Sequence, residues 1–329
     1  MSKGEQAVTD QKAARTGGGR DGSLDWLRWL CLFGVLMQHS KFGGRYSAST
    51  VSMIDTLASL TNWCVLGFFF VSGAVSKDAA LTWSGFARRT VRLLGPYLFA
   101  SAVSYAALAV CVRIKLVNSD ALPGAGEAVR KVLTGEGIGP HLYFLSYLWA
   151  IALVVGLMRR FAGPVPTLIL AAAGAVATEW LWPTSQAPTG HWHVNVPLYV
   201  LAYAWGAGLQ DLRGTLSRGR LLALGMTLLA AVAAWASGIC PRLVLVCIPP
   251  VLLACLRMLP LGNPPAVNQI GAIYLWHEPI LMPGLSRVFE RAGIDDLPNL
   301  ACTIVATAVL SVFANEAVKR LPGGRLLVL

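Results

Sequence analysis

Apolar residues along the chain gather into ten long runs, separated by short stretches that are polar, charged or rich in glycine and proline. A helix needs about 20 mostly apolar residues to cross the hydrocarbon core of a bilayer, and each run has that length or comes close to it. The pattern therefore predicts an all-α fold, a polytopic membrane bundle of about ten transmembrane helices. The runs cover residues 24–42, 54–76, 86–112, 141–158, 165–182, 194–210, 219–237, 241–259, 266–284 and 298–318.

The first run, from Ser23 to Ser40, carries two ionisable residues that lipid disfavours, Arg28 and His39. Such residues in a membrane helix usually face protein or water and mark a functional site. Eleven positions separate the pair. At ~100° and ~1.5 Å per residue, this spacing predicts that both lie on one helix face, about 16 Å apart. Asp25 lies one turn before Arg28 and is expected to pair with it.

The composition agrees with a membrane protein: 55% of the 329 residues are hydrophobic, only 13% are charged, and the mean hydropathy is +0.59. The net charge of +11 could indicate nucleic-acid binding, but the basic residues lie at the ends of apolar runs, so membrane topology explains them better and no nucleic-acid partner is expected. The seven cysteines form no C-x-x-C pair and are interpreted as small packing residues.

The distribution of Lys and Arg predicts the orientation, because cytoplasmic loops hold an excess of both. With a cytoplasmic N-terminus, 17 of the 27 Lys and Arg residues fall in cytoplasmic segments, nine fall outside, and Arg28 remains in the membrane. Both termini are therefore expected in the cytoplasm. The predicted division is a disordered tail over residues 1–22, a membrane domain over residues 23–321 and a short cytoplasmic tail over residues 322–329.

Two further patterns have alternative interpretations. Arg88, Arg89 and Arg92 at the start of the third run could simply reflect topology, but arginines so spaced also suit a polyphosphate, since a guanidinium group can bind phosphate oxygens in pairs. Ser72 and Gly73 follow three phenylalanines, and here close helix packing is the favoured interpretation.

Polar residues also mark the later runs. His141 opens the fourth run and is expected at the outer interface, near Tyr143 and other aromatic residues. Glu179 is expected near the same surface. His277 and Glu278 precede Pro279, where a proline-disturbed helix frees carbonyls that need polar partners, so they form a second candidate site.

Metal binding has little support in the sequence. His191 and His193 form an H-x-H pair on the outer side, but without a nearby third ligand an interfacial position is favoured and no metal is expected. No motif of a serine hydrolase, zinc protease, dinucleotide-binding or P-loop protein occurs.

Taken together, these motifs resemble acyltransferase family 3, integral-membrane acyl-CoA-dependent acyltransferases. The resemblance spans nearly the whole chain, and the ten-helix count also matches the family. Tyr143-Phe144 departs from the Trp followed by Phe or Ser that many relatives carry. The matching residues are Asp25 and Arg-x10-His (Arg28, His39) in the first helix, Phe69, Phe70, Ser72 and Gly73, then Arg88, Arg89, Arg92, Leu93, Pro96 and Tyr97, and last Tyr274-Leu275-x-His277.

The resemblance implies a stand-alone O-acyltransferase in the plasma membrane, most simply that of a bacterium, which moves an acyl group, expected to be acetyl, from cytoplasmic acyl-CoA to a sugar, glycan or other small hydroxyl-bearing acceptor. His39 would be the general base, a role that neutral imidazole suits, with Arg28 and Asp25 beside it. The donor would bind Arg88, Arg89, Arg92, Ser72 and Tyr97; the acceptor would contact His141, Tyr143, Glu179, His277 and Glu278.

A proton-coupled transporter or flippase of a glycan or antibiotic is the alternative function. Arg28, His39, His277 and Glu278 could line its path, since ionisable residues in membrane helices often do. That function has no special role for the cytoplasmic arginine cluster, whereas coenzyme A binding needs it. His277 is likewise the alternative general base to His39.

Overall fold

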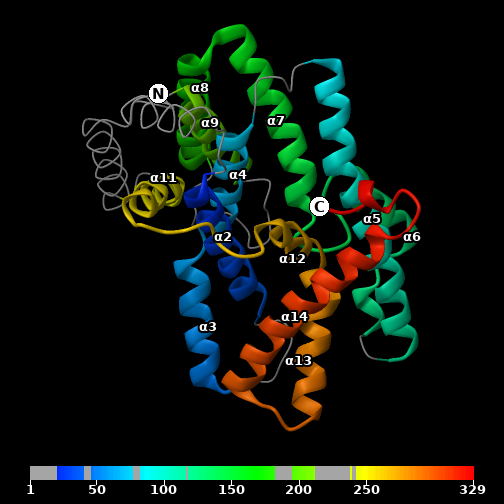
Figure 1. Cartoon of the computed structure of the whole chain (residues 1–329). Coiled ribbons are helices and arrows are strands. Elements are labelled where there is room, and N and C mark those ends of the chain that lie inside the picture. The colour runs from blue at the N-terminus through cyan, green and yellow to red at the C-terminus, as the bar shows by residue number, and fades with distance from the viewer. Residues whose placement is uncertain are drawn as a thin grey trace, which may run out of the picture.

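The computed structural model describes residues 21–40, 46–76, 82–115, 118–181, 195–211, 238 and 242–329. Within these ranges the regular secondary structure is helical, which confirms the predicted all-α membrane bundle (Figure 1). The seventh run lies outside the described residues, so the count of about ten spans stays a prediction. Nearly all of the predicted N-terminal tail also lies outside them. Helical segments long and apolar enough to cross a membrane are Ala48–Val75, Trp83–Arg113, Tyr143–Ala162, Pro164–Leu181 and Asp296–Lys319.

The second run, predicted over residues 54–76, lies almost entirely within the candidate membrane span Ala48–Val75. It begins earlier and forms two helices, α3 (Ala48–Leu60) and α4 (Cys64–Val75), with a turn between them. Gln38 at the end of α2 (Gly22–Ser40) donates from Nε2 to the Thr61 carbonyl oxygen at 2.7 Å. A carbonyl that accepts a hydrogen bond from a side chain contributes less to the backbone hydrogen bonds of its helix. The helix is interrupted at this point, between α3 and α4.

Cysteine and glycine residues alternate where α2 crosses α4. A Cβ atom at Gly34 would meet Cys64 Sγ, and one at Gly67 would meet Cys31 Sγ. Both cysteines are fully buried. Each sulfur therefore lies against a glycine of the other helix, a close packing typical of membrane helices. This confirms the packing role predicted for these two cysteines.

Helix α4 crosses α9 (Val196–Asp211) closely, and the two helices pack extensively against each other. A Cβ at Gly73 would collide with the Tyr203 carbonyl oxygen, and one at Gly206 would collide with the Phe70 carbonyl oxygen. The two backbones thus touch in both directions. Close packing, the favoured interpretation of Gly73, is confirmed.

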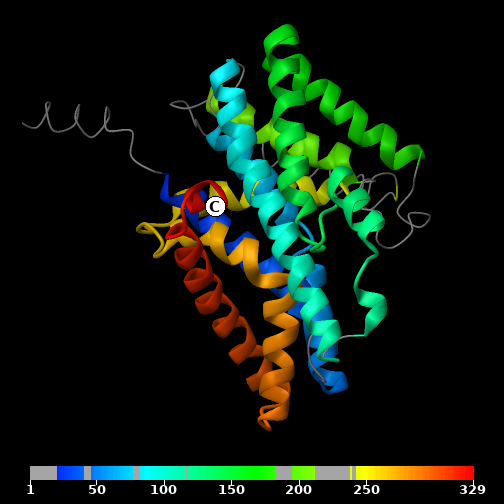
Figure 2. The same cartoon turned by 90° about the vertical axis from the view of Figure 1, so that its right-hand side faces the viewer.

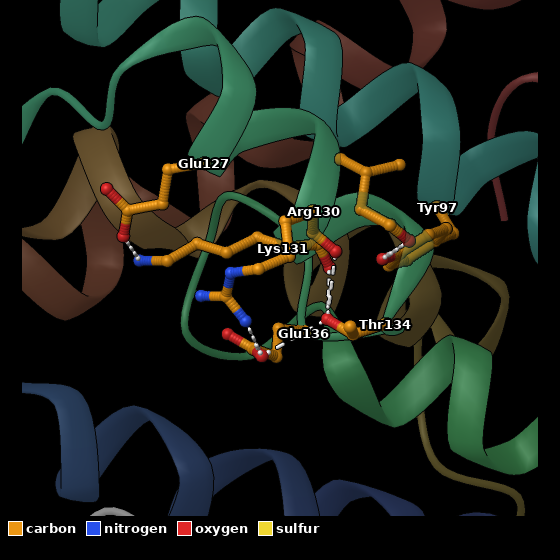
Figure 3. A network of polar contacts seen from close by, with 7 residues as sticks. Tyr97, Glu127, Arg130, Lys131, Thr134 and Glu136 are labelled. Carbon is orange, nitrogen blue, oxygen red and sulfur yellow. Dashed lines mark hydrogen bonds and ion pairs between the residues drawn. The ribbon is translucent and has the colours of Figure 1, made fainter.

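The middle of the chain forms a long helix, a folded-back segment and a helical hairpin (Figure 2). After α5, residues 118–142 return along that helix, so that α7 begins partway along it in both views. The Tyr97 hydroxyl donates to the Val132 carbonyl at 2.8 Å and ties this segment to α5 (Figure 3). The helices are α5 (Trp83–Arg113), α6 (Ala125–Leu133), α7 (Tyr143–Ala162) and α8 (Pro164–Leu181).

The last part of the described chain contains a broken span. Between α12 and α13 the helix widens into a π-helical turn, and Glu278 there has non-helical φ and ψ angles of −125° and 157°. The proline-disturbed helix expected at Pro279 is thereby confirmed. The elements are α11 (Leu243–Met258), α12 (Ile270–Trp276), the π turn η5 (His277–Leu281), α13 (Met282–Arg291) and α14 (Asp296–Lys319).

Helix α14 turns a polar stripe inward and apolar side chains outward. Val305, Val309 and Phe313 are exposed, as lipid requires. Its buried polar residues recur every four positions and therefore share one face. They are Asn299, Thr303, Thr307, Ser311 and Asn315.

Replacing Gly206 with alanine should destabilise the protein, because the added methyl group collides with the backbone of α4. Overpacking of this kind costs roughly 1–3 kcal/mol. Gly208 is the matched control: it lies on the same helix and has nothing within 4 Å of its Cβ position. Gly208→Ala should be neutral or stabilising by up to ~1 kcal/mol. Thermal unfolding in detergent measures both, and equal midpoints for the two variants would contradict the close crossing.

Candidate active site

Helix α2 places the polar residues of the first run at its two ends. Near its start, Arg28 Nη1 donates to Asp25 Oδ1 at 2.7 Å, with the Asp25 side chain 2% and the Arg28 side chain 26% exposed. The predicted pairing is confirmed. Trp26 and Trp29 next to this pair donate to the carbonyls of Gly262 and Pro265, so the segment before α12 covers the start of α2.

At the other end of α2, His39 belongs to a cluster of three histidines from distant parts of the chain. The ring centroids of His39 and His277 are 5.1 Å apart, and those of His141 and His277 are 4.6 Å apart. His141 and His277 are buried, whereas the His39 side chain keeps 17% exposure. The sequence therefore named all three residues, but not that they meet.

His141, predicted to lie at the outer interface, is buried among the helices and only 2% exposed. Its position follows from residues 118–142, which fold back along α5 and carry the start of α7 inward (Figure 2). Gly139 allows the close approach, because a Cβ there would stand 2.9 Å from His141 Cε1. An apolar run of spanning length suggested a helix that starts at the membrane surface, and this return path has no sequence signal.

The helix break explains how the other two histidine rings are held. Pro279 has no amide hydrogen, so the carbonyl of Leu275, four residues earlier, lacks its helical partner. His141 Nε2 lies 3.2 Å from that oxygen, and His277 Nδ1 lies 2.8 Å from the Tyr274 oxygen. A carbonyl can only accept, so both ring nitrogens carry a hydrogen.

These hydrogen bonds determine which state the other nitrogen of each ring is in. In a neutral imidazole, one nitrogen donates and the other holds a lone pair. His141 Nδ1 and His277 Nε2 are therefore the acceptor atoms, and both are buried without a hydrogen-bond partner among the described residues. Either nitrogen could accept a hydrogen bond from a substrate hydroxyl.

Glu278 brings an acidic side chain to the cluster. Its Oε1 lies 3.7 Å from His39 Nδ1, and its side chain is 5% exposed. The non-helical backbone at Glu278 turns this residue off the path of α12. An acidic group at one ring nitrogen favours the tautomer with its lone pair on the other nitrogen, as in histidine-dependent acyl transfer. The two candidate sites of the sequence, at His39 and at His277-Glu278, are therefore one site.

Aromatic rings form one wall of the cluster. Tyr274 donates its hydroxyl to the His141 carbonyl at 2.6 Å and lies 5.2 Å from the Phe144 ring centroid. Phe69 stacks on Tyr199 at 4.6 Å. The sequence analysis did not single out Tyr199, because an aromatic residue in an apolar run reads as ordinary packing. The wall makes this side of the cluster apolar, which limits water.

The three arginines near the start of α5 do not all point the same way. Arg89 donates from Nη2 to Ser76 Oγ at 2.9 Å at the end of α4, while Arg88 and Arg92 are exposed one turn apart. Ser72 is half-buried on α4. Two guanidinium groups are therefore presented together and the third faces α4.

Other predicted site residues lie apart from the histidines or have structural partners. Glu179 forms an ion pair with Arg242 and connects α8 to the start of α11. The Tyr143 hydroxyl lies 3.4 Å from that of Tyr199. Tyr97, predicted to bind the donor, holds the 118–142 segment through its hydroxyl. His191 and His193 lie outside the described residues.

The histidine cluster does not have the arrangement of a metal centre. Among the described residues, no group of three or more His, Cys, Asp or Glu side chains could hold a metal ion. Two of the ring nitrogens already face backbone carbonyls. The cluster offers imidazole lone pairs and an acidic side chain, the kinds of group that take and hold a proton.

Comparison with known proteins agrees with this chemistry. The model of acyltransferase family 3, described as an acyltransferase domain, matches residues 21–316. The chain belongs to this family. It is a membrane acyltransferase, and the matched range includes every histidine of the cluster. Searches of curated proteins and of solved structures gave no significant match.

Proposed function

We propose that this acyltransferase moves an acetyl group from cytoplasmic acetyl-CoA to a hydroxyl group of a sugar, a glycan or another small acceptor, with His39 as the general base. One observation carries the proposal: His39 Nδ1 lies 3.7 Å from an acidic side chain, at Glu278 Oε1. Catalytic hydrogen bonds are often long before substrate binds, so this separation suits a base that is engaged during the reaction.

In the proposed step, His39 takes the proton of the acceptor hydroxyl while the oxygen attacks the thioester carbonyl. A carbon–oxygen bond forms, the carbon–sulfur bond then breaks, and the departing thiolate of coenzyme A takes the proton back from the imidazolium. Glu278 stabilises the imidazolium between these events and is a positioning residue. The step is therefore balanced: the acyl group moves from sulfur to oxygen, and the proton moves from the acceptor hydroxyl through His39 to coenzyme A.

The donor is proposed to approach from the cytoplasmic ends of α2 and α5. Arg88 and Arg92 are exposed there and can bind phosphate oxygens in pairs. Arg28 is already paired with Asp25, so its guanidinium group is held in one place. From Arg28 to His39 the helix rises about 16 Å, roughly the reach of an extended donor arm. The acceptor would then meet the thioester at the histidine cluster.

His39→Ala is expected to insert normally, bind acetyl-CoA and lose at least ~10² in turnover, the usual contribution of a positioned base. Steady-state transfer and equilibrium binding measure the two properties separately. Phe33→Ala is the control, because that side chain lies on the same helix and is 50% exposed. Near-normal turnover of His39→Ala, with loss in His277→Ala, would transfer the role to His277.

Glu278→Gln should lower kcat and leave the affinity for acetyl-CoA unchanged. An imidazolium and a carboxylate about 4 Å apart interact by about 4 kcal/mol at an effective dielectric constant of 20, so a loss of tenfold or more is expected. Because Glu278 acts through His39, the double variant with His39→Ala should be no slower than His39→Ala alone. Fully additive losses would show that the two residues act independently.

Replacing Arg88, Arg89 and Arg92 together with alanine should weaken acetyl-CoA binding strongly, because hydrogen bonds to charged groups contribute roughly 1.5–3 kcal/mol each. Isothermal titration of the purified protein measures the change. Arg159 and Arg160 at the end of α7 are also basic and predicted to be cytoplasmic, so their double alanine variant is the matched control. Unchanged affinity in a correctly inserted triple variant would show that the three arginines reflect membrane topology and do not bind the donor.

A further inference from the structure

One face of α5 leads from the exposed arginines to the histidine cluster. Its residues follow one another at intervals of four, three and four positions, which places them on one side of the helix. The helix rises about 16 Å between the first and the last of them. At the far end, Phe99 meets Trp276, with ring centroids 6.0 Å apart, and Trp276 directly precedes His277. The residues of this face are Arg88, Arg92, Gly95 and Phe99.

Residues 324–329 lie across the middle of this face. Both views place this end of the described chain beside α5 and α12 (Figures 1 and 2). A Cβ atom at Gly95 would stand 2.6 Å from the Leu326 carbonyl oxygen, and one at Gly271 on α12 would stand 2.8 Å from Leu329 Cβ. The 324–329 segment therefore occupies the route between the arginines and the histidine cluster.

The segment does not match the polar atoms around it. Asn315 Nδ2 donates to the Leu329 main-chain oxygen at 3.4 Å, which is long, and Asn315 Oδ1 is buried without a hydrogen-bond partner among the described residues. The Ser311 hydroxyl, one turn away on α14, and Trp276 Nε1 are also buried without a partner in that part of the chain. Buried polar groups without partners destabilise a protein. The apolar side chains of Val328 and Leu329 cannot provide such partners.

We propose that the space now filled by residues 324–329, between α5, α12 and α14, binds the acyl-carrying arm of the donor, and that the segment leaves when the donor enters. The identity of this ligand rests on the proposed function. The arm of coenzyme A carries two amide groups and a hydroxyl, which donate and accept hydrogen bonds. Trp276 Nε1 can donate to an amide carbonyl, and Asn315 Oδ1 can accept from an amide N–H. The arm thus satisfies polar atoms that the segment leaves unpaired.

Competition between the segment and the arm has a defined consequence. Both cannot lie on Gly95, because even a methyl group there would meet the backbone of the segment. Each therefore weakens the binding of the other to the same extent. The apparent affinity for the donor falls with the fraction of molecules in which the space is open. A segment that is instead a permanent wall of the fold predicts no such competition.

A reversible disulfide tests whether the segment must leave. In the double variant Gly271→Cys with Leu329→Cys, the two Cβ positions are 2.8 Å apart, and a small shift brings them to the roughly 3.5–4.5 Å of a disulfide. Oxidation with diamide should lower the affinity for acetyl-CoA at least tenfold, and reduction with dithiothreitol should restore it. Peptide mass spectrometry identifies the cross-link. The Leu329→Cys single variant, treated in the same way, is the control and should not respond.

Unchanged affinity of the cross-linked protein would overturn the proposal, because the arm would then bind with the segment in place. Absence of the cross-link after oxidation would also overturn it, since the segment would not lie at Gly271. Failure of the proposed function would look different: the unsubstituted protein would not bind acetyl-CoA under either condition.

Trp276→Phe tests the arm itself, because this change removes the Nε1 donor and keeps an aromatic ring against Phe99. The affinity for acetyl-CoA, measured by isothermal titration, should fall about threefold to tenfold, the usual contribution of one hydrogen bond. Trp180→Phe is the matched control, because the Trp180 side chain is 80% exposed on α8. Equal affinity of Trp276→Phe and the unsubstituted protein would overturn the placement of the arm beside Trp276.

Discussion

The missing amide hydrogen of Pro279 is the constraint on which the histidine cluster depends. An ordinary residue there would close the helical bond to the Leu275 carbonyl. With proline, that oxygen is available to His141 Nε2 at 3.2 Å, and the non-helical backbone at Glu278 leaves the Tyr274 oxygen to His277 Nδ1 at 2.8 Å. Two backbone acceptors thereby fix two imidazole tautomers. The same break turns Glu278 towards His39, so one local irregularity arranges most of the site.

The surrounding bundle makes such an irregularity tolerable in a membrane. Backbone and side-chain polar groups cannot face lipid without cost, so they must find partners inside the protein. On α14, the Asn299 side chain donates to the carbonyls of Ser286 and Ile294 and accepts from the Ser286 and Thr303 hydroxyls. This network joins α13 to α14 directly beyond the break. Beyond the break, the broken span is therefore held by polar contacts and not by apolar packing alone.

The sequence was sufficient for features that depend on local spacing. The Asp25–Arg28 pair, the disturbed helix at Pro279 and the packing role of Gly73 follow from spacings of a few residues, and all are confirmed. What it could not predict depends on the path of the chain in three dimensions. The inward return of residues 118–142, which carries His141 into the core, and the turn after α3 leave no periodic trace in an apolar run. Hence the three histidines of the cluster were named individually but assigned to separate places.

The proposal that His39 is the base rests on the change that a base undergoes in the reaction. When an imidazole takes a proton, both of its nitrogens become donors and the ring becomes a cation. His141 and His277 pack on each other with ring centroids 4.6 Å apart, so a cation on either would face a neutral ring whose own N–H is already directed to a carbonyl. Of these three, His39 has the acidic side chain of Glu278 beside a ring nitrogen, and it keeps more exposure than the other two. Glu278 can hold the positive charge for as long as the tetrahedral intermediate lasts, whereas the other two histidines are better suited to accept hydrogen bonds as neutral groups.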